Sequence, residues 1–206
     1  EGKTNLCDTL RTIGFDFDGT FAEYMEIPAE AFLQDHVTRV PHHLESKQAV
    51  LSEPIACIMN AQSYLHISEG DVVAVFGSGF IGTMHASLAL HSGAKKVFMI
   101  DINNNRLRMA KDIIPELHCI NSTEKSLPDA VLDATQQDGV DVAITACSVG
   151  AAQKDALNIT GKGGRVSLFG GLPKDSAGFI DSNIVHYKEI SVYGAHASTV
   201  TQNRNV

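Results

Sequence analysis

The 206-residue sequence contains no tryptophan and no long apolar run. No stretch approaches the roughly 18 apolar residues that a membrane-spanning helix needs, so we expect no membrane partner of that kind. Lys and Arg (16) are outnumbered by Asp and Glu (24), the net charge is −8, and no basic cluster is present. Because nucleic acids and anionic membranes attract basic surfaces, the charge argues against both as partners.

The N-terminus lacks an initiator methionine and has no apolar segment behind a basic flank. The missing apolar segment argues against a signal peptide. The missing methionine leads us to expect that the chain starts inside a longer protein.

Cysteine is scarce, and the four cysteines lie far apart: Cys7, Cys57, Cys119 and Cys147. A disulfide framework would be denser, so we expect reduced thiols in a cytoplasmic protein. Neither C-x-x-C nor H-x-x-x-H occurs, so the nine histidines form no recognisable zinc site. The adjacent His42 and His43 are expected in a solvated loop.

From residue 72 onward, short apolar runs alternate with helical segments. Apolar content of 44% is that of a globular chain. Six runs predict strands: 72–76, 96–101, 118–121, 140–145, 165–169 and 189–193. Four segments predict helices: 80–91, 103–113, 127–137 and 151–159. This order predicts an α/β fold with a doubly wound parallel sheet and right-handed crossovers, the Rossmann type.

The first part of the chain follows a different pattern. Residues 21–28 alternate apolar and polar side chains and end at proline, which predicts a half-buried strand. Residues 45–65 carry apolar side chains at helical spacing. Pro54 lies inside that run and is expected to end or kink a helix near Glu53.

The strongest motif is Gly77-Ser78-Gly79-Phe80-Ile81-Gly82, which follows a predicted strand and opens a predicted helix. In this G-x-G-x-x-G pattern the first glycine permits a tight turn and the second lets the backbone approach a pyrophosphate. The third lets the helix pack against the strand. Helix N-terminal N–H groups then face the anion. A glycine-rich turn without a ligand is the alternative interpretation.

Asp101 favours the dinucleotide interpretation. It ends the second predicted strand, close to the spacing expected for a carboxylate that binds an adenosine ribose. The alternative interpretation is that Asp101 only caps the N-terminus of the next helix, as an acidic residue after a strand usually does. Its charge would repel a 2′-phosphate, which favours NAD(H) over NADP(H). Arg106 acts in the opposite sense, because it can cover an adenine face or accept a phosphate.

The carboxyl ends of the other central strands supply further candidates for the nicotinamide half of the coenzyme. Residues 145–148 (Thr145, Ala146, Cys147, Ser148) and 169–172 (Phe169, Gly170, Gly171, Leu172) fall there. Ordinary strand–loop transitions explain each segment equally well when it is taken alone.

A rival motif lies near the N-terminus. Residues 16–20 read D-x-D-G-T, which resembles the first motif of haloacid-dehalogenase-type phosphatases, with Asp16 as nucleophile and Asp18 as acid/base. That chemistry needs a buried strand that aims two carboxylates at one Mg²⁺. The preceding residues make a poor buried strand and no later acidic motif follows, so we interpret the segment as a turn.

Taken together, the motifs resemble the medium-chain, zinc-dependent alcohol dehydrogenase family, closest to its polyol (sorbitol/L-iditol) and threonine dehydrogenase branch. Residues 19–24 are similar to that family's G-x-F-A-E-Y strand, and residues 51–57 (L-S-E-P-I-A-C) to its L-x-E-P segment. The glycine motif, Asp101 with Arg106, and residues 168–171 follow in the family's order.

The resemblance implies two partial zinc sites. Glu53 corresponds to the glutamate beside the catalytic zinc, as a ligand or through water. Cys7 corresponds to the fourth cysteine of the structural zinc lobe. The remaining ligands of both sites would precede residue 1, so we expect the chain as given to bind NAD(H) without turning over.

The resemblance also implies an organisation and an activity. Residues 1–44 would be the end of a GroES-like catalytic domain, 45–197 the NAD-binding Rossmann domain, and 198–206 the start of a return to the catalytic domain. The parent protein would transfer hydride between NAD and a secondary alcohol, a polyol or a hydroxy amino acid. The strand at 190–193, with 194–197, would join a homodimer or dimer of dimers. A non-catalytic nucleotide-binding module is the alternative.

Overall fold

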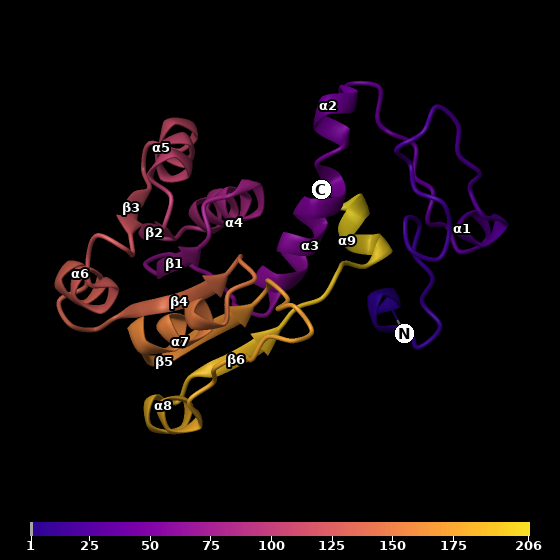
Figure 1. The fold of residues 1–206 in the computed structure, drawn as a ribbon. Helices are drawn as coiled ribbons and strands as arrows, with labels where there is room; N and C mark the ends of the chain where they lie inside the picture. Colours follow the sequence, from indigo (N-terminus) through magenta and orange to yellow (C-terminus); the bar gives the residue numbers. More distant parts are fainter. Residues whose placement is uncertain (1) are drawn as a thin grey trace. The chain divides into compact units, whose positions relative to one another are not determined.

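Six parallel strands form one sheet in the computed structural model, which describes residues 2–206 (Figure 1). They are β1 (Val72–Phe76), β2 (Lys96–Asp101), β3 (His118–Asn121), β4 (Val140–Thr145), β5 (Thr160–Leu168) and β6 (Ser191–Gly194). Their spatial order is β3-β2-β1-β4-β5-β6, and all neighbours are parallel. The predicted doubly wound sheet is therefore confirmed.

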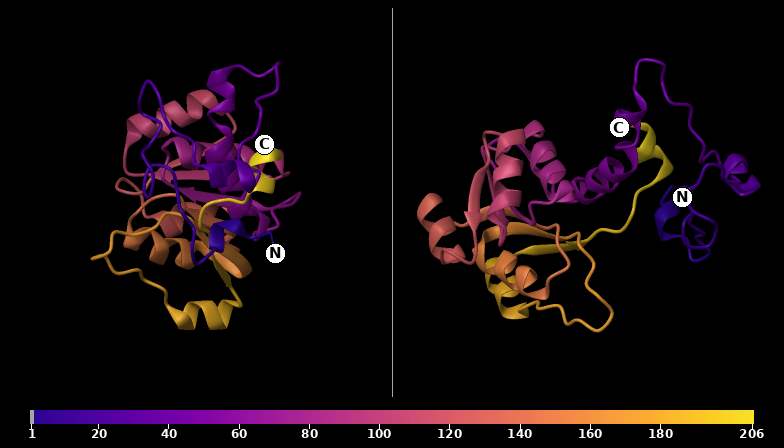
Figure 2. Two further views of the ribbon diagram at one scale, coloured as in Figure 1. Left: turned by 90° about the vertical axis from the view of Figure 1, so that its right-hand side faces the viewer. Right: turned by 45° about the horizontal axis from the view of Figure 1, so that its top comes forward.

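Helices cover both faces of the sheet (Figures 1 and 2). The helices α4 (Phe80–His91) and α5 (Asn104–Ile113) contribute to the buried cluster on one face. The helices α6 (Leu127–Ala134), α7 (Gly150–Ile159) and α8 (Ser182–Lys188) pack against the other. The chain runs outward from β1 to β3 and then resumes at β4 beside β1, so the strand order reverses between these two strands. Ligands of such sheets bind at the carboxyl ends of the strands at this reversal.

The apolar runs serve both faces because side chains alternate along a strand. In β1, Ala74 and Phe76 lie in one buried cluster, whereas Val73 and Val75 lie in the other. A strand buried on both faces needs apolar residues at every position, which is why these segments read as continuous apolar runs.

The contacts divide the chain into two compact units, Ala61–His196 and Glu1–Asn60 with Ala197–Val206. The first unit contains the whole sheet. The helix α3 (Ser52–Ser63) crosses from one unit into the other. The domain boundaries predicted at 44/45 and 197/198 stay predictions.

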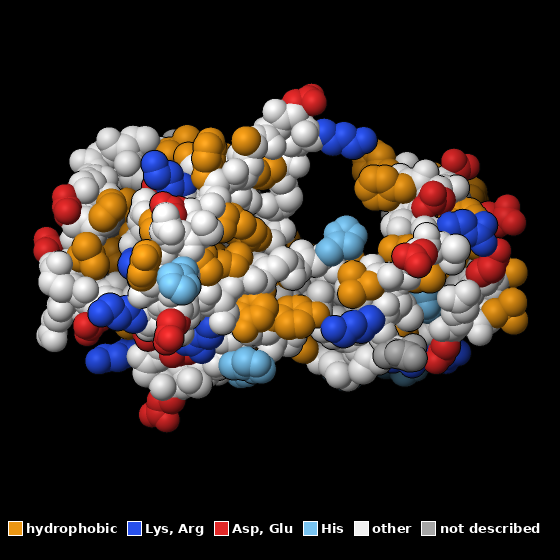
Figure 3. All heavy atoms as spheres, turned by 90° about the horizontal axis from the view of Figure 1, so that it is seen from below, with side chains coloured by type: hydrophobic (Ala, Val, Ile, Leu, Met, Phe, Trp, Pro, Cys, Tyr) orange, Lys and Arg blue, Asp and Glu red, His pale blue; other side chains and the backbone are white. Residues whose placement is uncertain are grey.

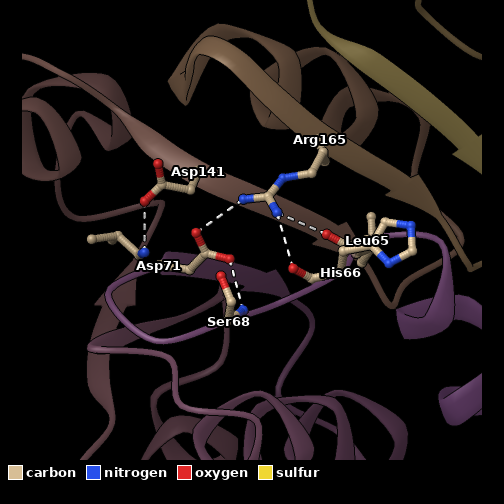
Figure 4. Close-up of polar contacts among 7 residues, drawn as sticks. Leu65, His66, Ser68, Asp71, Asp141 and Arg165 are labelled. Atoms are coloured by element: carbon tan, nitrogen blue, oxygen red, sulfur yellow. Dashed lines mark hydrogen bonds and ion pairs between the residues drawn. The ribbon is translucent and has the colours of Figure 1, made fainter.

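A polar clamp ties the amino ends of the central strands together (Figure 4). The Arg165 guanidinium donates to the carbonyl oxygens of Leu65 and His66, at 2.9 and 3.2 Å. It also lies 3.0 Å from Oδ1 of Asp71, and both side chains are largely buried. Since the clamp lies at the amino ends of the strands, its role is structural rather than coenzyme-binding.

The N-terminal unit contains helical segments and no strand among the residues that the structure describes. Its elements are the 3₁₀ turn η1 (Thr4–Leu6), α1 (Ala29–Leu33), α2 (Ser46–Ala49), the beginning of α3, and α9 (Val200–Arg204). The strand predicted at 21–28 is wrong, because residues 21–27 are exposed and irregular. A half-buried strand needs a neighbouring strand for its backbone hydrogen bonds, and none is present among residues 2–60. Apolar side chains such as Phe21 and Tyr24 are consequently exposed.

Pro54 lies in the first turn of a helix instead of ending one. The helical run predicted at 45–65 is split at residues 50 and 51, and α3 starts at Ser52. Pro54 is its third residue, where the missing N–H costs no intrahelical hydrogen bond. Glu53 therefore lies in the first turn of α3.

The turn predicted at residues 16–20 lies slightly earlier, at residues 14–16, where an isolated β-bridge joins Ile13 and Phe17. Oδ2 of Asp16 accepts a hydrogen bond from the N–H of Thr12 (2.7 Å), and both aspartates are exposed. His42 and His43 also lie in an exposed turn. Figure 3 shows the apolar side chains of the surface among charged ones. In the part of the chain that the structure describes, no helix is long and apolar enough to cross a membrane.

Candidate functional site

The glycine motif forms the loop between β1 and α4, and the first and third glycines are required by sterics. Gly77 has φ +99° and its N–H donates to the carbonyl of Ile100 at 2.7 Å. A Cβ at Gly77 would lie 2.9 Å from the Ala146 carbonyl oxygen. A Cβ at Gly82 would lie 1.7 Å from that of Gly77. A larger residue at Gly82 would therefore push helix and strand apart.

Gly79 differs from the other two glycines because the position where a side chain would begin faces free space. A Cβ there would meet no atom of residues 2–206 within 4 Å, and the backbone is extended (φ −73°, ψ −174°). Gly79 is also the N-cap of α4, and no described side chain caps this helix. The N–H groups of Phe80 and Ile81 at the positive end of the helix dipole therefore stand beside open space, as an anion site requires.

Asp101 lies at the end of β2 and points at the glycine loop. Its Oδ2 accepts hydrogen bonds from both the N–H (2.7 Å) and the hydroxyl (2.8 Å) of Ser78. Its Oδ1 accepts one from the N–H of Asn103 (3.0 Å). Partial burial raises the pKa of Asp101, but the hydrogen bonds from Ser78 and Asn103 outweigh it and leave the pKa below its ordinary value. Asp101 is therefore an anion at neutral pH.

Arg106 lies in the first turn of α5, which begins immediately beyond Asp101. Its backbone N–H donates to Oδ1 of Asn103, the N-cap of the helix, at 3.2 Å. The Arg106 side chain is exposed. Asn103, and not Asp101, is therefore the N-cap of α5. The Asp101 carboxylate points instead toward the glycine loop.

The loops after β4 and β5 form the neighbouring wall. The N–H of Ala146 donates to the carbonyl of Phe76 (2.8 Å), and that of Gly170 to the carbonyl of Thr145 (2.7 Å). A Cβ at Gly170 would lie 2.4 Å from the Cys147 carbonyl oxygen, so the two loops touch through glycine. The predicted segments 145–148 and 169–172 are thereby brought together beside Gly77.

Two side chains of this wall differ in their exposure. Thr145 is fully buried, and its hydroxyl donates to the Ser167 carbonyl at 3.3 Å. The Cys147 thiol is half-buried. Burial raises its pKa, and the charge of Asp101 adds to the effect, so the thiol stays protonated at neutral pH. Gly171 is exposed, and a Cβ there would meet nothing within 4 Å.

His85 supports this wall and was not expected from the sequence. It lies in α4, fully buried, and its ring packs edge-on against Phe169 with centroids 4.6 Å apart. Nε2 of Gln62 lies 3.2 Å from His85 Nδ1 and donates to the His85 carbonyl at 2.8 Å. Burial lowers the pKa of His85 to about 3, so the ring is neutral. No motif marks this histidine, because its partners Gln62 and Phe169 come from two distant segments, α3 and the loop after β5.

The two residues implied as zinc ligands lie in the N-terminal unit. Glu53 is exposed, and its Oε1 accepts a hydrogen bond from the Cys57 thiol one turn further along α3, at 3.2 Å. Burial, with Glu53 adding to it, raises the pKa of Cys57 to about 11. Cys7 is exposed with its sulfur 3.4 Å from the Thr9 hydroxyl.

Zinc does not fit these residues. A protein zinc site needs three or four ligands. Within residues 2–206, no three His, Cys, Asp or Glu side chains converge. Cys7 and Glu53 therefore hold no metal by themselves, and their zinc roles stay predictions.

In both sequence and structure, this chain is similar to zinc-type dehydrogenases. The sequence model described as "Zinc-binding dehydrogenase" matches residues 81–205. The L-threonine 3-dehydrogenase of Photorhabdus laumondii is 32% identical over 197 residues, which are 95% of this chain and 54% of that protein. An uncharacterized zinc-type alcohol dehydrogenase-like protein of Haemophilus influenzae is 29% identical, over 96% of this chain and 55% of its own length. The chain thus spans about half the length of the curated relatives it matches.

Solved structures show the same extent of similarity. A zinc-binding dehydrogenase from Sinorhizobium meliloti 1021, bound to NADP, has a TM-score of 0.87 and 27% identity. The match covers 98% of this chain and 58% of that one. An alcohol dehydrogenase from Escherichia coli CFT073, complexed with NADH, has a TM-score of 0.86, with 99% of this chain and 58% of that chain covered. Its 23% identity supports the fold alone.

Proposed function

The chain belongs to the zinc-binding dehydrogenase family, and we propose that it is the NAD(H)-binding part of an oxidoreductase. The parent protein would transfer hydride between the coenzyme and a secondary alcohol, either a polyol, as in sorbitol dehydrogenase-like proteins, or a hydroxy amino acid. The threonine dehydrogenase relative supports the hydroxy amino acid.

One observation carries the coenzyme proposal. An anionic carboxylate, Asp101, is fixed by Ser78 beside a helix start that no described side chain caps, and Gly79 opens that start to free space. Helix N–H groups and a carboxylate are the two features that bind the diphosphate and the adenosine ribose of a dinucleotide. The residues present therefore fit the coenzyme.

Each residue then has a role in binding. The N–H groups at the start of α4 would hold the diphosphate, and Asp101 the ribose hydroxyls. The wall of Ala146, Phe169 and Gly170 would orient the nicotinamide half, with His85 holding the Phe169 ring in place. The coenzyme, when bound, supplies the hydride chemistry, and the protein supplies the geometry.

Coenzyme choice follows from charge. Asp101 would repel the 2′-phosphate that distinguishes NADP(H), which supports NAD(H). The exposed Arg106 is the group that could offset this repulsion. Since structures similar to this chain include one bound to NADP and one complexed with NADH, the choice has to be measured for this chain.

We further propose that the chain as given binds coenzyme without turning over alcohol. No three metal-ligating side chains converge within residues 2–206, and no metal-dependent step can be assigned to this chain's own residues. The same observation favours a second candidate, a nucleotide-binding module without chemistry. The two candidates differ in the longer protein, where only the enzyme reduces NAD when an alcohol is added.

Assembly and location complete the proposal. Within residues 2–206, β6 pairs only with β5, so one edge of the sheet is open at Ser191–Gly194. An open edge favours pairing with a second copy, and we propose a homodimer or a dimer of dimers. The four cysteines are all free, which supports the cytoplasmic location.

Calorimetric titration of NADH, NADPH and Zn²⁺ into the 206-residue chain tests the function. We expect NADH to bind at least about tenfold more tightly than NADPH, a difference of about 1.4 kcal/mol, and zinc to show no stoichiometric binding. A chain that does not bind NADH would overturn the proposal. Equal affinity for both coenzymes would overturn the role of Asp101.

A further inference from the structure

Ser78 stands between the first two glycines of the loop and is only 5% exposed. Both of its hydrogen-bond donors point at the same atom, Oδ2 of Asp101, at 2.7 Å from the nitrogen and 2.8 Å from the hydroxyl oxygen. The G-x-G-x-x-G pattern requires no particular side chain at this position. The hydroxyl therefore makes a contact that the motif itself does not account for.

The hydrogen bonds that Asp101 accepts from Ser78 and Asn103 are not equivalent. Two come from backbone N–H groups, those of Ser78 and Asn103, which almost any residue at these positions would provide. Within residues 2–206, only the Ser78 hydroxyl donates to this carboxylate from a side chain. Hydrogen bonds to an ionised carboxylate are short and about twice as strong as neutral ones. This hydroxyl is thus the one replaceable contact that fixes the orientation of the carboxylate.

We infer that Ser78 is a positioning residue that sets coenzyme choice by holding Asp101 in the orientation that accepts a ribose diol and opposes a 2′-phosphate. The inference rests on the proposed binding of NAD(H) and adds a residue to it. Ser78 acts through Asp101 and need not touch the coenzyme. Without the hydroxyl, the carboxylate keeps its backbone partners but can turn away from the ribose, so NADH loses affinity and NADPH meets less repulsion.

A double-mutant cycle on the 206-residue chain tests this, with Ser78→Ala, Asp101→Ala and the double variant. The measured quantity is the ratio of the Kd for NADPH to the Kd for NADH, obtained by calorimetry. We expect Ser78→Ala to lower the ratio about three- to tenfold, the scale of one hydrogen bond to a charged group. In the Asp101→Ala background the same substitution should change the ratio less than about twofold, because its target is gone.

Two further variants separate positioning from packing. Ser78→Cys keeps the side-chain volume but replaces the hydroxyl with a weak donor, so we expect it to lower the ratio as well. Thr160→Val is the matched control, since it removes a buried hydroxyl that donates to the Ala156 carbonyl (2.6 Å) at the start of β5. We expect it to lower thermal stability and leave the ratio unchanged.

The outcomes distinguish this inference from the function on which it rests. If Asp101→Ala lowers the NADPH-to-NADH Kd ratio while Ser78→Ala and Ser78→Cys leave it unchanged, the inference is overturned and the proposed function stands. If Ser78→Ala lowers this ratio equally with and without the Asp101 carboxylate, Ser78 acts directly on the coenzyme and the inference is again overturned. A chain that binds neither coenzyme overturns both.

Discussion

Nη2 of Arg165, which lies in β5 opposite the first residue of β6, is 3.0 Å from Oδ1 of Asp71, the residue before β1. The two side chains are 22% and 13% exposed. The same guanidinium donates to two carbonyls of the segment that leads into β1. One side chain therefore joins the beginning of the sheet to a strand almost 100 residues later.

Arg165→Met should lower the free energy of unfolding by about 2–4 kcal/mol, because it leaves a largely buried carboxylate without its partner. Urea denaturation followed by circular dichroism measures the change. Arg108→Ala is the control, since Arg108 is exposed and its guanidinium donates to the nearby Asn105 side chain at 3.3 Å, so we expect a loss below about 0.5 kcal/mol. Equal losses for the two variants would contradict the structural role of the clamp.

Buried His85 predicts a loss of stability in acid. Its pKa is about 3 in the folded chain against an ordinary value of 6.5. Below pH 6.5 the His85 ring binds a proton in the unfolded chain, but in the folded chain it binds one only near pH 3. The contribution to stability is therefore complete above about pH 7 and is lost as pH falls from 6.5 toward 3, by up to about 1.4 kcal/mol per pH unit.

His85→Met removes the titrating group while keeping an apolar side chain, so it isolates this effect from that of other acids. We expect the variant to be less stable than the natural chain at pH 7, because Gln62 loses its contact with the ring nitrogen and keeps only the backbone carbonyl. We also expect it to lose less further stability between pH 7 and pH 4. Chemical denaturation at a series of pH values measures both slopes. Parallel slopes would show that His85 titrates in the folded chain as it does when unfolded.

The sequence predicts the sheet well because the central strands carry their own signal. Strands buried on both faces read as apolar runs, and β2, β3 and β4 begin and end where predicted. The glycine motif and Asp101 were likewise predictable, since spacing alone places them at adjacent strand ends.

Other features depend on contacts between distant residues and could not be predicted. The segment at 21–28 alternates like a strand, but alternation does not supply the neighbouring strand that pairing needs. The short helix α8 has no long apolar period and depends on its N-cap, Asp181. The contact of His85 with Phe169 joins residues 84 positions apart through packing alone.

Lys188 closes the carboxyl end of a helix to which it does not belong. Its Nζ donates to the carbonyls of Asn158 (3.0 Å) and Thr160 (2.8 Å), at the end of α7. Because a cation there satisfies two carbonyls and opposes the negative end of the helix dipole, Lys188→Met should cost about 1–2 kcal/mol. Lys154→Met, on the exposed face of the same helix, should change the melting temperature little. A stability loss no larger than that of this control would show that the cap contributes nothing.

The glycine loop offers a prediction in which fold and binding separate. Gly82→Ala should destabilise the chain severely, because its Cβ would lie 1.7 Å from the Gly77 carbonyl oxygen. Gly79→Ala should change the melting temperature by no more than a few degrees, since the backbone of Gly79 is extended and its Cβ would meet no described atom within 4 Å.

The methyl group of Gly79→Ala would occupy the space beside the helix start where the diphosphate is proposed to lie. Gly79→Ala should therefore weaken NADH binding at least about tenfold, a loss of about 1.4 kcal/mol, in a chain that is still folded. Calorimetry together with thermal unfolding measures both quantities, and a Gly79→Ala chain that binds NADH as tightly as the natural one would mean that the diphosphate lies elsewhere.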